Sequence, residues 1–278
     1  MRWPFAVAAF LALGIAASPL SARADDLSPY MEKCKEAGVP LPPKWPDAKW
    51  TQRKPDLPKE KVFDPDPKFD TPVTEVFVYE TDLGICYALP RKSKDGEILL
   101  LGIICQGKKS GKACFWDNVK PGTSEKIQGK DLKLDPAKIG DGSNLLENCT
   151  ECHRGDNAFN ITPGTALDLD RKADGARDPK KMDRTDRKGE VDTPPFTPLG
   201  HDGWENPMRP GDDPLSYRGE GCAFCHAIPK MTKLYCGMVN RMINRHVMPP
   251  SGKPDADEKQ DIDEIKKECK KRGYVWED

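Results

Sequence analysis

The sequence predicts an α+β protein, with a small antiparallel β-meander as its N-terminal module and a mainly α-helical, loop-rich region after it. Three observations support this fold class. Residues 75–117 hold short runs rich in Val, Ile, Tyr and Phe, separated by turn signals. Residues 231–243 and 256–271 repeat apolar side chains at helical spacing. Two further stretches, 25–72 and 168–198, are crowded with Pro and charged residues, which is typical of extended chain and loops.

The first 24 residues have the pattern of a secretory signal peptide. Arg2 gives a positive start, residues 5–17 are almost wholly apolar, and residues 22–24 form a small-x-small cleavage site. The alternative is a transmembrane anchor, but the apolar run is too short and no stop-transfer pattern follows it. We therefore expect cleaved export, a periplasmic location and no stable membrane insertion.

Residues 25–72 form a Pro-rich leader that we expect to be extended and to wrap a folded body, with one short helical pattern at residues 30–37. Residues 73–134 form a β-rich module. Its expected strands are residues 75–81, 85–89, 97–106 and 113–117. The module could dock a partner or ligand, or it could be a scaffold that covers the functional site and excludes water. We favour the scaffold.

Residues 135–278 form the predicted helical region. A first helix is expected to start near Asp135 and to lead into residue 149, a second covers residues 231–243, and a third covers residues 256–271. The apolar face of the third helix consists of Ile262, Ile265 and Cys269.

Two pentapeptides in this region carry the main chemical signal. Residues 149–153 read CTECH and residues 222–226 read CAFCH. The pattern C-x-x-C-H is typical of c-type haem attachment, in which two thiols form thioethers to the porphyrin and the His ligates the iron. Cys pairs at this spacing also occur in zinc sites, thioredoxin-like redox sites and structural disulfides. Because two matches occur among only four His residues, we predict two haem c groups, each with its iron.

Each motif residue then has an expected role. The cofactor-binding residues are Cys149, Cys152, Cys222 and Cys225, and the proximal metal ligands are His153 and His226.

The order of these features resembles a known family. A signal peptide, C-x-x-C-H, a helix, the Met-Pro-Pro segment at residues 248–250 and a terminal helix together resemble a class I cytochrome c module, and the whole resembles a di-haem c-type cytochrome. The resemblance covers residues 140–278 and implies a cytochrome c-like di-haem region. It implies Met248 as the sixth ligand of the second iron, with His246 as the alternative.

The sixth ligand of the first iron is less constrained, because no Met-Pro segment follows His153 at a similar distance. The available donors are His201, Met208 and Met182, of which we expect His201 to bind.

Six cysteines remain after the four haem cysteines are subtracted from ten. An even number in an exported protein predicts three disulfides, although buried free thiols are an alternative. Cys105 and Cys114 should face each other across the turn at residues 107–111. The other expected pairs are Cys236 with Cys269, which lie on the last two helices, and by elimination Cys34 with Cys86.

Charge excludes one class of partner. The chain has 44 basic and 45 acidic residues, and cleavage of the signal peptide removes Arg2 and Arg23. The mature chain is then about three charges negative, which argues against a nucleic-acid partner. The expected partners are redox proteins.

The expected function is one-electron transfer by an exported di-haem c-type cytochrome, an electron carrier with no catalytic residues. One alternative is a di-haem peroxidase-like enzyme with an open first haem. We disfavour it because such enzymes space their motifs much farther apart than the 73 positions between Cys152 and Cys225. The other alternative is an electron-transfer or docking subunit of a periplasmic oxidoreductase.

Overall fold

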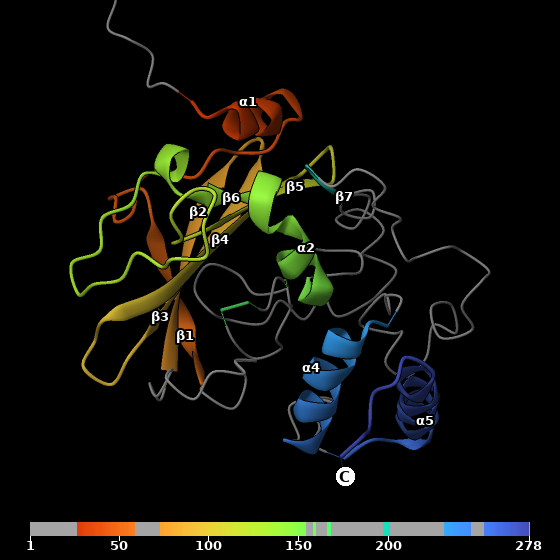
Figure 1. The fold of residues 1–278 in the computed structure, drawn as a ribbon. Helices are drawn as coiled ribbons and strands as arrows, with labels where there is room; N and C mark the ends of the chain where they lie inside the picture. Colours follow the sequence, from red (N-terminus) through yellow and green to blue (C-terminus); the bar gives the residue numbers. More distant parts are fainter. Residues whose placement is uncertain are drawn as a thin grey trace, which may run out of the picture.

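The computed structural model describes residues 27–58, 73–153, 158–159, 166–167, 197–200, 231–245 and 253–277. Their centre is a seven-stranded sheet in which six strands follow one another in chain order, from β1 to β6, while β7 pairs with β5. Figure 1 shows α1 at one end of this sheet, α2 beside β5 and β6, and α4 and α5 farther along the chain.

Four strands form the predicted antiparallel meander. They are β2 (Val73–Thr81), β3 (Gly84–Lys92), β4 (Ile98–Gly107) and β5 (Lys112–Asp117). Each pairs antiparallel with the next. Side chains point to opposite faces along each strand, and the apolar residues of these strands occupy both faces, so that both faces of the sheet are covered.

The described part of the leader belongs to the same body. Ser28 caps α1 (Pro29–Glu36) by accepting a hydrogen bond from the backbone N–H of Met31. β1 (Thr51–Pro58) pairs antiparallel with β2 as the edge strand of the sheet. The register shifts between Arg53 and Leu57, where Pro55 interrupts the ladder. Proline is tolerated in edge strands, so this segment can pair with β2 in spite of its two prolines. We predicted it as extended leader, and the structure shows it as a strand.

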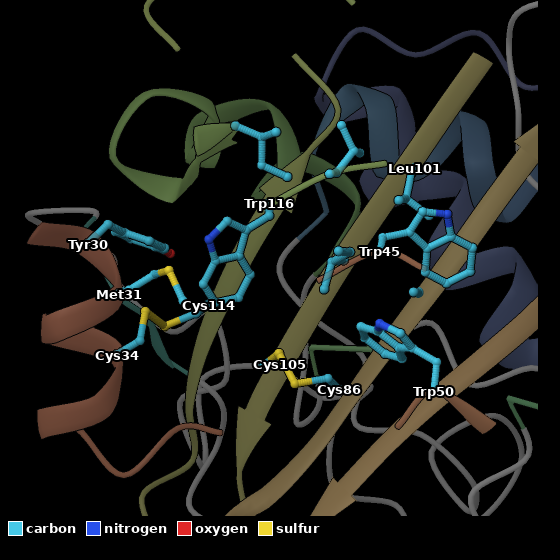
Figure 2. Packing of buried hydrophobic residues seen from close by; sticks show 14 of the residues in the cluster. Tyr30, Met31, Cys34, Trp45, Trp50, Cys86, Leu101, Cys105, Cys114 and Trp116 are labelled. Carbon is cyan, nitrogen blue, oxygen red and sulfur yellow. A yellow bond between two sulfur atoms is a disulfide. The ribbon is translucent and has the colours of Figure 1, made fainter. Parts of the chain in front are cut away.

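One face of the sheet carries the larger core. Figure 2 shows Trp45, Trp50 and Trp116 packed around two disulfides on this face. The rings meet edge to face, with the centroids of Trp45 and Trp50 5.9 Å apart and those of Tyr30 and Trp116 5.7 Å apart. α1 contributes Tyr30 and Met31 to this core. The leader is therefore fixed to the module by buried apolar area.

The described residues contain three disulfides, as predicted, but two of the predicted pairings are wrong. Cys236 is bonded to Cys269 as expected, whereas the other bonds are Cys34–Cys114 and Cys86–Cys105. Cys105 lies opposite Cys114 on β5, as the hairpin predicted, but it also lies opposite Cys86 on β3. Because Cys105 bonds to Cys86, Cys114 is left to bond with Cys34 of α1, in line with the packing of that helix against β5.

The predicted fold class is wrong in its second part. Residues beyond 134 add β6 (Gly140–Asp141) and β7 (Thr197–Pro198) to the same sheet. β7 runs parallel to β5, so the sheet is mixed. The described residues thus form a mixed seven-stranded sheet with few helices, not a meander followed by a mainly α-helical cytochrome c-like region. Both extra strands are two residues long and have no periodicity that a sequence could reveal.

The last two helices lie where the sequence predicts them. They are α4 (Lys233–Asn244) and α5 (Ala256–Lys271). Asp255 and Glu258 form a capping box at the start of α5. Ile265, Cys236 and Cys269 are buried with Met231 between the helices, and the disulfide crosses this cluster. Ile262 is buried as well, so the predicted apolar face of α5 is confirmed.

Candidate functional site

The first C-x-x-C-H pentapeptide forms the C-terminal end of a helix. α2 (Gly142–Cys152) follows β6 and is capped by Asp141, whose side chain accepts a hydrogen bond from the backbone N–H of Ser143 at 3.0 Å. A short 3-10 helix (Pro136–Lys138) precedes β6. The predicted start at Asp135 is therefore a separate turn, and α2 begins at residue 142.

Helical spacing places the two motif cysteines together. Cys149 and Cys152 are three positions apart and therefore share one face of α2. Cys149 packs against Ala113 and Phe115 of β5 and against Ala158, all three of which are fully buried. The sheet therefore fixes the position of the last turn of the helix.

His153 ends the helix and is held at three points. Its backbone N–H donates to the carbonyl of Cys149 at 3.0 Å. Its ring Nδ1 lies 2.7 Å from the carbonyl oxygen of Ala158. The ring of Phe115 meets the imidazole edge to face, with centroids 6.1 Å apart. Because a carbonyl only accepts hydrogen bonds, Nδ1 carries the proton, and Nε2 keeps its lone pair.

The electrostatic setting keeps these groups neutral. Burial raises the pKa of the Cys149 thiol to about 12, and the nearby Asp117 adds to the rise. Burial lowers the pKa of His153 to about 4, while the bond to Ala158 opposes this shift and Arg91 adds to it. Near pH 7 the thiol is protonated and the imidazole is neutral. A neutral imidazole is the form that binds metals, whereas a protonated thiol is a poor nucleophile.

A second contact joins the pentapeptide to the C-terminal helices. Thr232 caps α4 by accepting from the backbone N–H of Tyr235, and its hydroxyl donates to the carbonyl of Glu151 at 3.1 Å. The last turn of α2 therefore lies between the sheet and the cap of α4.

The structure tests the location of one predicted site only. Of the predicted site residues, Cys149, Cys152 and His153 lie in the described part of the chain and are adjacent at the end of α2. The second motif and every proposed sixth ligand lie outside it. These residues are Cys222, Cys225, His226, His201, Met248, His246, Met208 and Met182. The predicted signal peptide, residues 1–24, also lies outside the described residues.

The prediction of two haem c groups with their irons is wrong on the described residues. Within these ranges, no group of three or more His, Cys, Asp and Glu side chains is arranged to hold a metal ion. Six of the eight cysteines in the same ranges form disulfides. The C-x-x-C spacing thus does not build a zinc site here from protein ligands alone. Cys149 and Cys152 are the two cysteines outside the disulfides.

Two residues that matter for this site were missed from the sequence. Gln106 of β4 accepts a hydrogen bond from the backbone N–H of Ala158, 52 positions away, and Tyr30 of α1 accepts one from Phe115, 85 positions away. A polar residue at the end of an apolar strand is the single local signal for Gln106. Contacts between residues so far apart in the chain cannot be predicted from the spacing of residues in a motif.

None of the helices in the described ranges is long and apolar enough to cross a membrane. Comparison of the chain with protein-family models, curated proteins and solved structures finds no match.

Proposed function

We propose that this protein is an exported one-electron-transfer protein that resembles the c-type cytochromes, with its redox group attached at residues 149–153. One observation carries the proposal. His153 donates from Nδ1 to the carbonyl of Ala158, which leaves the Nε2 lone pair available directly after two cysteines on one helix face. The proposal concerns this pentapeptide alone, and two haem c groups are no part of it.

The thiols favour attachment over dithiol exchange. A thioredoxin-like site needs a cysteine with a lowered pKa, because the thiolate is the attacking species. Burial instead raises the pKa of Cys149 to about 12. A partly buried, neutral thiol beside a second one is suited to anchoring a group through thioethers, and a redox group held there would gain and lose single electrons.

Each residue of the pentapeptide then has a role. Cys149 and Cys152 anchor the group to α2, and His153 presents Nε2 as a ligand. Phe115 and Ala158 contact the imidazole and cover part of it. The transfer makes and breaks no covalent bond, since one electron arrives from a redox protein and leaves to another. The sheet serves as the scaffold of the site through β4 and β5.

Export is part of the same proposal. Three disulfides are expected in an oxidising compartment, and they agree with the signal-peptide pattern at residues 1–24. We propose the periplasm as the location and redox proteins, not nucleic acids, as the partners. We propose no stable membrane insertion.

A redox titration of the purified, exported protein tests this function. The protein should show a visible absorption band that changes reversibly in a one-electron step. The variant Cys149→Ala/Cys152→Ala should lose that band. The matched control Cys236→Ala/Cys269→Ala also removes two cysteines but leaves the pentapeptide unchanged, and it should keep the band. A wild-type protein with no reversible one-electron step would contradict the proposal.

A further inference from the structure

A chain of two hydrogen bonds links the middle of the sheet to the imidazole of His153. Gln106 is the second-last residue of β4 and is 6% exposed. Its Oε1 accepts a hydrogen bond from the backbone N–H of Ala158 at 2.9 Å. The carbonyl oxygen of the same Ala158 accepts from Nδ1 of His153 at 2.7 Å. The backbone N–H of Ala158 is therefore bonded to the sheet, and its carbonyl is bonded to the imidazole of His153.

The strand geometry explains why Gln106 can reach Ala158. Gln106 is paired with Ile85 on β3 and with Ala113 on β5, so its backbone position is fixed on both sides. Side chains alternate along a strand, and the side chain of Gln106 therefore points to the same face as Ile104. This is the face on which Phe115, Ala158 and Cys149 are packed.

The buried amide of Gln106 must make a hydrogen bond to offset the cost of its burial. Burying an amide without a hydrogen bond is unfavourable, because the amide loses its bonds to water and gains none in return. The neighbours on this face are apolar: Ile104, Ala113 and Phe115. A leucine would satisfy the packing at lower cost, but it would leave the N–H of the fully buried Ala158 without its acceptor. The amide oxygen therefore holds the Ala158 peptide in one orientation.

We propose that Gln106 is the positioning residue of His153. By holding the N–H of Ala158, it directs the carbonyl of that residue at Nδ1 and so keeps the imidazole with Nδ1 protonated and Nε2 available. Outer contacts of this kind fix the tautomer and orientation of ligating histidines. That Nε2 serves as a ligand rests on the proposed function, whereas the tautomer that Gln106 imposes does not.

The tautomer of His153 can be read directly by nitrogen-15 NMR of the full mature chain. Cys149→Ala/Cys152→Ala is used as the background, so that no attached group affects the spectrum. Loss of one set of histidine signals in His153→Gln assigns the resonances. In the background chain the Nδ1–H tautomer of His153 should be the single form at neutral pH. With Gln106→Leu, we expect this single form to give way to a mixture in which Nε2–H is populated.

Two further substitutions and a control define the outcome. Gln106→Asn keeps an amide but is one methylene shorter, and it should also give the mixture. Gln106→Glu keeps an acceptor oxygen at the original reach and should restore the Nδ1–H form. Gln128 lies outside β4, and its Nε2 donates to the carbonyl of Leu99 on that strand at 3.2 Å in an exposed contact. Gln128→Leu should change nothing at His153.

The proposal is overturned if Gln106→Leu or Gln106→Asn is folded, as judged by circular dichroism, and still shows the pure Nδ1–H form. Failure of the proposed function gives a different result. In that case the exported protein lacks a reversible one-electron step, while the dependence of the tautomer on Gln106 is unchanged. The two results come from different samples and can be told apart.

Discussion

The phenolic oxygen of Tyr30 in α1 accepts a hydrogen bond at 3.2 Å from the backbone N–H of Phe115 in β5. Tyr30 is 4% exposed, and burial raises the pKa of its hydroxyl well above the ordinary value, so the group is neutral at all physiological pH values. The ring of Phe115 in turn meets the imidazole of His153. The leader helix therefore supports the strand against which the pentapeptide packs.

Tyr30→Phe tests this support. The substitution keeps the ring but removes the acceptor, which leaves the buried N–H of Phe115 without this hydrogen bond. We expect a loss of about 1–3 kcal/mol in the free energy of unfolding, measured by urea denaturation with the disulfides intact. Tyr79→Phe is the control, because Tyr79 is a half-buried ring packed against the same core. Equal stability of Tyr30→Phe and the control would contradict the role of the hydroxyl.

Gly142 tests how closely Tyr30 approaches the start of α2. A Cβ atom at position 142 would lie 2.0 Å from the hydroxyl oxygen of Tyr30, far inside contact distance. Gly142→Ala should therefore displace either the ring or the helix and cost about 1–3 kcal/mol. Gly129→Ala adds the same methyl group where nothing lies within 4 Å, and it should change stability by less than about 0.5 kcal/mol. A thermal melt of both variants distinguishes them, and similar melting temperatures would refute the close approach.

The side chain of Asn118 joins β4 to the loop around Ile127, and substitutions of Asn118 test how much these bonds stabilise the fold. Its Oδ1 accepts from the backbone N–H of Leu101 at 2.8 Å, and its Nδ2 donates to the carbonyls of Leu99 at 3.2 Å and Ile127 at 2.7 Å. The side chain is fully buried. Asn118→Ala should leave all three groups without these bonds and cost at least about 3 kcal/mol in urea denaturation.

Asn118→Asp separates the two kinds of bond. It keeps an acceptor for Leu101 but turns the donor toward Leu99 and Ile127 into a second acceptor, so most of the loss should remain. If both Asn118 variants lose less than about 1 kcal/mol, the network does not stabilise the fold in the way that its geometry indicates.

The pH dependence of stability tests the neutral state of His153. Its pKa is lowered to about 4 from the ordinary value of 6.5, so the unfolded chain binds a proton before the folded chain does. The contribution of His153 to the free energy of unfolding is fully present above about pH 6.5. It is lost as the pH falls toward 4, because protonation of the unfolded chain favours unfolding. The loss should reach at most about 3 kcal/mol, and less to the extent that the partly exposed ring keeps contact with water.

The comparison uses Cys149→Ala/Cys152→Ala with and without His153→Gln, each unfolded in urea between pH 7 and pH 4. Carboxylates titrate in both chains, so the difference between the two curves belongs to His153. The chain with the histidine should show the steeper fall. Parallel curves would show that the imidazole is not held neutral by its surroundings.

The contrast between β4 and β6 shows which parts of the fold the sequence could predict. β4 was predicted nearly to its ends, because the almost continuous apolar run from Ile98 to Cys105, with turn signals on both sides, indicates a buried strand. The helix of residues 256–271 was predicted because its apolar side chains recur at helical spacing. β6 and β7 have two residues each, and β1 carries two prolines, so their pairing depends on distant partners rather than on local pattern.

The disulfides and the site follow the same division. The register that places Cys105 opposite Cys114 was predictable, but a strand in the middle of a sheet has two neighbours, and the choice of Cys86 was not. Similarly, C-x-x-C-H identified Cys149, Cys152 and His153. The contacts of Gln106 and Tyr30 with the backbone around them come from the folded chain alone, since no local pattern encodes a bond to a backbone N–H far along the sequence.

The mass of the peptide that contains residues 149–153, released from the exported protein by proteolysis after reduction and alkylation, tests the central claim most directly. The proposed function predicts that Cys149 and Cys152 resist alkylation and that the peptide carries one covalently attached group. Cys236 and Cys269, which are released by reduction, should both be alkylated in the same sample. A peptide with both motif cysteines alkylated and no added group would contradict the account.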